Sequence, residues 1–68
     1  MGDQDVTGSY RHFKGGLYEV LGVARHSETE EELVVYASGT GEWWVRPKSM
    51  FFGHTTVDGV RVARFTRI

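Results

Sequence analysis

The chain alternates apolar and polar residues over short runs, and no segment has both the length and the periodicity of a long helix. Residues 17–26 form the clearest predicted strand. The positions expected on one of its faces are Tyr18, Val20, Gly22 and Ala24. Its other face carries Leu17, Leu21 and Val23. Apolar residues on both faces suit a tightly curled barrel, and Gly22 predicts a bulge or bend in mid-strand.

Two further strands and a helical turn are predicted in the middle of the chain. Leu33–Tyr36 is β-branched and aromatic, which is typical of strands. Glu42–Arg46 is the next strand, after a turn of small residues at 37–41. Pro47 ends it. Because a proline followed by polar residues can open a short helix, we expect one 3₁₀ turn at Lys48–Phe51.

The end of the chain carries the strongest local signal, the dipeptide Asp58-Gly59 between β-branched residues. Asp-Gly favours a two-residue hairpin turn, which pairs positions symmetrically about itself. We therefore expect a β-hairpin over 52–65. The expected pairs are Val57 with Val60, Thr55 with Val62, and Phe52 near Phe65.

Length and composition support one small all-β domain. A chain of 68 residues buries only about 60% of the surface that its unfolded form exposes. Aromatic residues make up 13% of the chain and supply large side chains for a core, and there is no cysteine for disulfides or thiolate metal sites. We expect a barrel over residues 10–68, after a flexible N-terminal segment at 1–9 rich in small polar residues.

The chain has 8 Lys and Arg residues and 9 Asp and Glu residues, which gives a net charge of -1. It therefore lacks the overall positive charge that drives nonspecific binding to nucleic acids. No apolar stretch approaches the roughly 20 residues that span a bilayer, and the N-terminus has no signal pattern. We expect a cytoplasmic protein without a membrane partner.

The histidines are the first place to look for metal or acid–base chemistry, but His12, His26 and His54 have no short ligand spacing. His26-Ser27-Glu28 contains the residue types of a nucleophilic triad, yet a triad depends on geometry and not on adjacency. Its expected role is a loop in which the Ser27 or Thr29 hydroxyl and the Glu28 carboxylate satisfy nearby backbone amides. We predict no catalytic residue, no metal site and no cofactor.

Two segments place cationic side chains beside aromatic rings, Tyr10–Lys14 and Trp43–Pro47. Such a surface can stack on a planar group and hold an anion. Neighbours in a strand face opposite sides, so Trp43 and Trp44 cannot share one core. We expect Trp44 and Arg46 on the ligand-facing side. The apolar alternates Trp43 and Val45 are expected in the core.

Several short motifs in a fixed order make the chain from Tyr10 to Ile68 resemble the bacterial domain-of-unknown-function family 1653. They are Tyr10-Arg11-His12-Phe13-Lys14-Gly15, Tyr18-Glu19-Val20-Leu21, Ala24-Arg25-His26-Ser27-Glu28-Thr29, Val34-Val35-Tyr36, Trp44-Val45-Arg46-Pro47 and Met50-Phe51. The resemblance implies a small SH3-like five-stranded β-barrel with no established activity. The chain departs from the family pattern at 37–41, which is short, and at 52–54, which lacks acidic residues.

The preferred functional hypothesis is a binding module that recognises a peptide, a nucleotide or a single-stranded nucleic acid. The residues expected at its surface are Tyr10, Arg11, His12, Tyr36, Trp44 and Arg46. An alternative is a structural protein in which a second copy of the chain covers the same aromatic surface as a homodimer. A small hydrolase is the weakest alternative, because so short a chain leaves little room for a sheltered pocket.

Overall fold

The computed structural model describes residues 6–68 of the protein. The fold is mostly β, with seven strands and one short helical turn in this range. In chain order the elements are β1 (Gly8–His12), β2 (Leu17–Arg25), β3 (Glu32–Ser38), β4 (Trp43–Pro47), α1 (Lys48–Phe51), β5 (His54–Val57), β6 (Val60–Ala63) and β7 (Phe65–Arg67).

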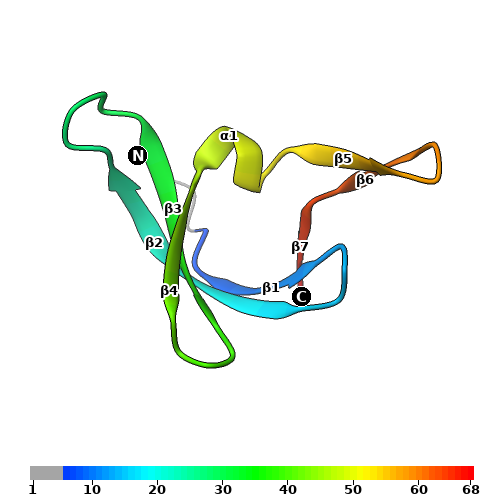
Figure 1. Ribbon diagram of the computed structural model, residues 1–68. Coiled ribbons are helices and arrows are strands. Elements are labelled where there is room, and N and C mark those ends of the chain that lie inside the picture. The colour runs from blue at the N-terminus through cyan, green and yellow to red at the C-terminus, as the bar shows by residue number, and fades with distance from the viewer. Residues whose placement is uncertain (1–5) are drawn as a thin grey trace.

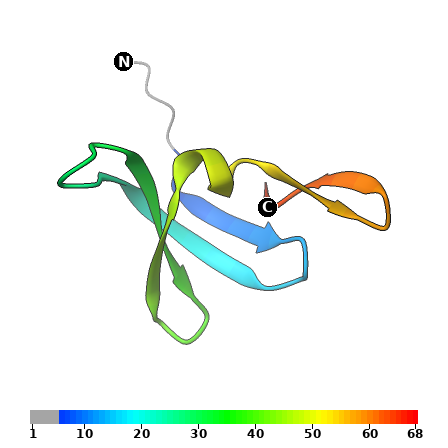
Figure 2. The same cartoon turned by 45° about the horizontal axis from the view of Figure 1, so that its top comes forward.

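The strands form two antiparallel sheets. Five of them run in the order β4-β3-β2-β1-β7, and β5 and β6 form a separate two-stranded sheet. The larger sheet curls beneath α1, and the β5–β6 hairpin extends to the side away from the β2–β3 loop (Figures 1 and 2). Over residues 6–68 the sheets do not close into a barrel, so β4 and β7 remain as edges.

The core lies on the concave side of the large sheet. Its buried residues are Tyr10, Val20, Val34, Tyr36, Phe51 and Phe65. Phe51 from α1 stacks on Phe65 from β7 with ring centroids 4.0 Å apart and an interplanar angle of 6°. Full burial of a side chain of this size stabilises a fold by about 1.5–3 kcal/mol. The helical turn therefore fills the curve of the sheet.

The predicted bulge in β2 is confirmed, since its register against β3 shifts between Val20 and Gly22. The bulge also reverses the alternation that follows it. Val20 lies opposite Tyr36 and Val23 opposite the buried Val34, so the register puts both on the core-bearing face of the sheet, where Val20 is buried and Val23 is 40% exposed. The prediction that Gly22 and Ala24 share a face with Tyr18 and Val20 is therefore wrong. The extra residue at the bulge moves the side chains that follow it to the other face of the sheet.

The hairpin at Asp58-Gly59 has the predicted register. Val57 pairs with Val60 and Thr55 with Val62, and both turn residues have positive φ, 51° at Asp58 and 80° at Gly59. The strands are shorter than predicted, because β5 begins at His54 and β6 ends at Ala63.

The two ends of the predicted hairpin belong to other elements. Phe65 lies in β7 opposite His12 of β1. The ring that stacks on Phe65 is that of Phe51, while Phe52 packs against Tyr10 and Phe51. The cause is the helical turn, which is present at the predicted residues Lys48–Phe51 as α-helix and turns Phe51 toward the core.

The N-terminal boundary lies earlier than the sequence suggested. Of the segment expected to be flexible, residues 1–5 lie outside the described residues, while Gly8 and Ser9 already belong to β1. Gly8 pairs with Val20, and the Ile68 amide donates to the Ser9 carbonyl at 3.0 Å. Small polar residues need no burial to join a backbone ladder, so composition does not identify this strand.

Candidate functional site

A cleft of about 410 Å³ opens at the β3–β4 end of the concave face. Its lining residues are Tyr18, Tyr36, Ser38, Thr40, Glu42, Trp44 and Arg46. They come from β2, β3, the β3–β4 turn and β4. Cross-strand pairing brings them to one face, because Tyr18 lies opposite Ser38 and Tyr36 opposite Trp44.

Trp44 and Arg46 share a face, as the alternation of β4 predicts, and both line the cleft. The expectation that Trp43 and Val45 fill the core is wrong, since they are 72% and 60% exposed. Trp44 itself is 50% exposed. The reason lies in the register. Trp44 and Arg46 are opposite the core residues of β3, and Phe51 and Phe65 already occupy the interior.

Tyr36 is buried, yet it contributes to the floor of the cleft. Its hydroxyl accepts a hydrogen bond from Nε of Arg46 at 3.4 Å. The Tyr18 ring packs edge-on against the Tyr36 ring, with the two ring centroids 5.5 Å apart. The guanidinium of Arg46 also lies over the Phe65 ring, 5.9 Å from its centroid. One cationic side chain thus connects the cleft with the core.

The three predicted site residues of β1, Tyr10, Arg11 and His12, do not lie together in the structure. Tyr10 is 4% exposed and packs edge-on against Phe51, and its hydroxyl donates to the Val6 carbonyl at 3.0 Å. Arg11 is exposed and lies opposite Leu17, on the convex face. Tyr10 belongs to the core and Arg11 to the other side of the sheet, so neither lines the cleft. The prediction failed because alternation divides neighbouring residues between faces.

His12 is the member of this group that approaches the site. It is half-buried, and its ring lies 4.9 Å from that of Phe65 and 6.3 Å from that of Tyr18. Its Nδ1 accepts a hydrogen bond from the Lys14 amide at 3.1 Å, which suits a neutral ring with the proton on Nε2.

The surroundings of His12 oppose its protonation. Desolvation by burial, followed by the positive charges of Arg46, Lys14 and Arg64, lowers the pKa of His12 below 6.5. At neutral pH the imidazole is therefore uncharged. The neutral ring keeps one N–H donor, at Nε2.

Sequence reasoning missed four residues that line the cleft, namely Tyr18, Ser38, Thr40 and Glu42. It also missed Arg64, which lies near His12 and does not line the cleft itself. Arg64 lies between β6 and β7, where its carbonyl accepts from the Phe13 amide at 3.0 Å. Its Nε is buried without a hydrogen-bond partner among residues 6–68. Tyr18 could have been found, since it shares the predicted face of Val20. No sequence pattern marks Arg64, because only the fold brings it to His12.

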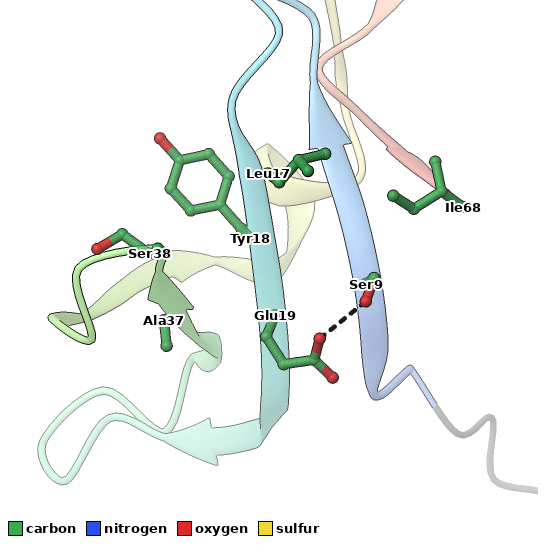
Figure 3. Close-up of a pocket in the computed structure, with 8 residues that line it drawn as sticks. Ser9, Leu17, Tyr18, Glu19, Ala37, Ser38 and Ile68 are labelled. Carbon is green, nitrogen blue, oxygen red and sulfur yellow. Dashed lines mark hydrogen bonds between the residues drawn. The ribbon is translucent and has the colours of Figure 1, made fainter.

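A second, smaller pocket of about 220 Å³ lies at the convex side of β1 and β2 (Figure 3). Glu19 points toward Ser9 across the two strands, whereas Tyr18 points to the other side of β2. Oγ of Ser9 donates to Oε1 of Glu19 at 2.8 Å. This pocket is smaller than the concave cleft and has no cationic side chain in its lining.

The loop at 26–31 is held by side chain to backbone hydrogen bonds, with Thr29 in the expected role and His26 in a role that was not expected. Nδ1 of His26 accepts from the amides of Glu28 and Thr29 at 3.1 and 3.3 Å. Oγ1 of Thr29 accepts from the Glu31 amide at 3.2 Å. Within residues 6–68, no three His, Cys, Asp or Glu side chains gather closely enough to hold a metal ion. No helix in this range is long and apolar enough to cross a membrane.

The fold and the cleft define a class of small, mostly β domain with an aromatic and cationic concave face. A family model described as a protein of unknown function, DUF1653, matches residues 8–67, and the chain belongs to this family. The crystal structure of a DUF1653 protein from Bordetella bronchiseptica is similar, with a TM-score of 0.85 and 29% sequence identity. The match covers 96% of this chain and 88% of the Bordetella chain. No curated protein matches the sequence.

Proposed function

We propose that the protein is a small cytoplasmic binding module that holds a peptide, a nucleotide or a single-stranded nucleic acid in the concave cleft. The observation that carries this proposal is the half-exposed Trp44 on the same face as Arg46, in a cleft whose other lining residues are two tyrosines, Ser38, Thr40 and Glu42. An exposed aromatic ring next to a guanidinium can stack on a planar group and bind an anion at once.

The dimensions of the cleft agree with such a ligand. Its volume of about 410 Å³ lies in the range of about 300–1,000 Å³ that is usual for small-molecule sites. Stacking on one aromatic side chain contributes about 1–3 kcal/mol per base in single-stranded nucleic-acid complexes. The ligand-contacting residues in this proposal are Tyr18, Tyr36, Trp44 and Arg46. The His12 ring lies next to this set, 6.3 Å from the Tyr18 ring.

We also assign the domain to the SH3-like class, as an open variant of the barrel. The support is a strongly curled antiparallel sheet, a bulged second strand and a short helical turn before the C-terminal strands. A bulge increases the twist and bend of a strand, which such small curled sheets need.

Chemical-shift perturbation with mononucleotides, short single-stranded oligonucleotides and peptides tests the binding function. Trp44→Ala should abolish the perturbations. The matched control is Trp43→Ala, which removes an adjacent exposed indole from the opposite face. If Trp44→Ala binds as well as the parent, or if no member of the three ligand classes shifts the cleft residues, the proposal is wrong.

A second candidate is self-assembly, which the convex face favours. Trp43 and Val45 are exposed on one face of β4, which is an edge strand of the large sheet as far as residues 6–68 show. Exposed apolar edges invite pairing with another strand, and two β4 strands can pair about a two-fold axis. Size-exclusion chromatography with light scattering should then show a dimer that Trp43→Ala dissociates. A concentration-independent monomer contradicts it.

A further inference from the structure

Three observations place His12, Arg46 and Arg64 near one another. The His12 ring and the Arg46 guanidinium both lie against Phe65, 4.9 and 5.9 Å from its centroid. The Arg64 carbonyl accepts from the amide of Phe13, the residue after His12, at 3.0 Å. The positive charges of Arg46, Lys14 and Arg64 also help to lower the pKa of His12. Like charges brought together in a partly desolvated place repel each other. Such a cluster is stabilised when an anion lies among its members.

No carboxylate of the described chain compensates the two arginines. Arg46 bonds to a phenol and lies over a phenyl ring. The Nε of Arg64 is buried with no hydrogen-bond partner within residues 6–68. An unsatisfied buried donor of this kind costs about 1–3 kcal/mol, and more when it is charged. The ion pairs Arg25–Glu30 and Lys48–Glu32 lie in other parts of the protein.

The cleft has opposite charges at its two ends. Glu42 lines it at the β3–β4 turn, four positions before Arg46. A strand rises about 3.3 Å per residue, which separates the two positions by roughly 13 Å along β4. Trp44 lies between them. A ligand with a planar part against Trp44 therefore meets the cationic cluster at the inner end.

We propose that His12, Arg46 and Arg64 form an oxyanion subsite that takes the phosphate or carboxylate group of the ligand. The Nε2–H of His12 and the two guanidinium groups are its donors. An arginine fork matches the oxygen geometry of both groups. The inference rests on the proposed function, in that the ring of the same ligand lies in the cleft at Trp44.

The subsite is tested with inorganic phosphate and with acetate as separate probes, at neutral pH and at constant ionic strength set with chloride. NMR follows the His12 ring and the Nε–Hε groups of Arg46 and Arg64. Saturable shifts at all three positions are expected. Shifts with phosphate alone identify a phosphoryl ligand, and shifts with acetate alone identify a carboxylate.

Substitutions establish whether those shifts report the subsite. Arg64→Gln should weaken the affinity for the active probe at least tenfold. Arg11→Gln is the matched control, because it removes an equal charge from the convex face, and it should leave the affinity unchanged. If Arg64→Gln does not fold, Arg46→Gln serves the same purpose. The proposal is overturned if neither probe gives saturable shifts, or if Arg11→Gln weakens binding as much as Arg64→Gln.

Failure of the subsite is distinguishable from failure of the proposed function. AMP and adenosine share a ring and differ in the phosphate. If both bind equally through Trp44, the binding function stands and a phosphoryl subsite is wrong. If phosphate or acetate shifts the NMR signals of the His12 ring, but Trp44→Ala weakens the binding of no aromatic ligand, the subsite stands and the proposed function is wrong.

Discussion

The guanidinium of Arg46 lies over the ring of Phe65, 5.9 Å from its centroid, and its Nε donates to the hydroxyl of Tyr36. Phe65 is in turn stacked on Phe51 at the centre of the core. Contacts with core residues thus hold the Arg46 side chain in place where it lines the cleft. A ligand held by Arg46 meets a positioned group, which reduces the entropy lost on binding.

Arg46→Lys separates geometry from charge at this position. The ammonium keeps the charge but loses the planar fork and the stacking on Phe65. We expect binding of the anionic probe to weaken severalfold, while the free energy of unfolding falls by only about 0.5–1 kcal/mol. NMR titration and urea denaturation measure the two effects. Equal affinities of variant and parent would show that charge alone suffices.

Trp43→Ala should leave the stability almost unchanged. The side chain is 72% exposed, and exposed substitutions usually change the free energy of unfolding by less than about 0.5 kcal/mol. Urea denaturation of the monomeric protein checks this. A loss of several kcal/mol would mean that the indole is covered in solution, as in a dimer.

Phe51→Leu is the complementary change in the core. Phe51 is fully buried and stacks on Phe65, so the smaller side chain leaves a void and removes the ring contact. We expect the free energy of unfolding to fall by about 1–3 kcal/mol, by analogy with other reductions of core side chains. Phe52→Leu is the control, because Phe52 is 39% exposed. Similar losses for both variants would contradict the assigned core.

Gly59→Val should destabilise the domain by about 1 kcal/mol or more. Gly59 has a φ of 80° in the hairpin turn, which a β-branched residue resists. The space around its Cβ position is open, so the cost comes from the backbone and not from a clash. Thermal melting of the variant against Gly59→Asn, which tolerates positive φ, isolates this effect. Equal melting temperatures for all three proteins would contradict it.

The lowered pKa of His12 predicts how stability depends on pH. Burial, followed by Arg46, Lys14 and Arg64, holds the folded-state pKa below 6.5, so the unfolded chain binds this proton more readily. The contribution of His12 is therefore fully present above pH 6.5 and is lost as the pH falls through the folded-state pKa. Denaturation of His12→Gln should show a smaller decline below pH 6.5 than the parent. Identical declines would contradict the assigned environment.

The sequence predicted turns, the bulge and the helical turn correctly, but it predicted less well which face of the sheet each strand residue occupies. Asp58-Gly59, Gly22 and Lys48–Phe51 carry strong local signals, because turn chemistry and backbone freedom act over a few residues. The face that the β4 residues present to the core depends on register against β3 and on Phe51 and Phe65 filling the interior. These are long-range contacts that alternation alone does not determine.

The site was predictable in part for the same reason. Trp44 and Arg46 share a face because they are two residues apart on one strand. Sequence adjacency alone puts Tyr10 and Arg11 in one group with His12. In β1, however, Tyr10 is buried in the core and Arg11 lies on the opposite face of the strand. Arg64 is far from His12 in the chain and comes near it only because β7 pairs with β1.

The hairpin β5–β6 has a ladder of its own, and the Arg64 amide bonds to the Gly53 carbonyl at its base. Its amide hydrogens can therefore exchange with solvent by local opening, while the large sheet stays intact. Isolated two-stranded ladders are marginally stable in water. Exchange at Thr55 and Val62 should consequently be faster than at Val34, and core substitutions that accelerate exchange at Val34 should leave the hairpin rates nearly unchanged.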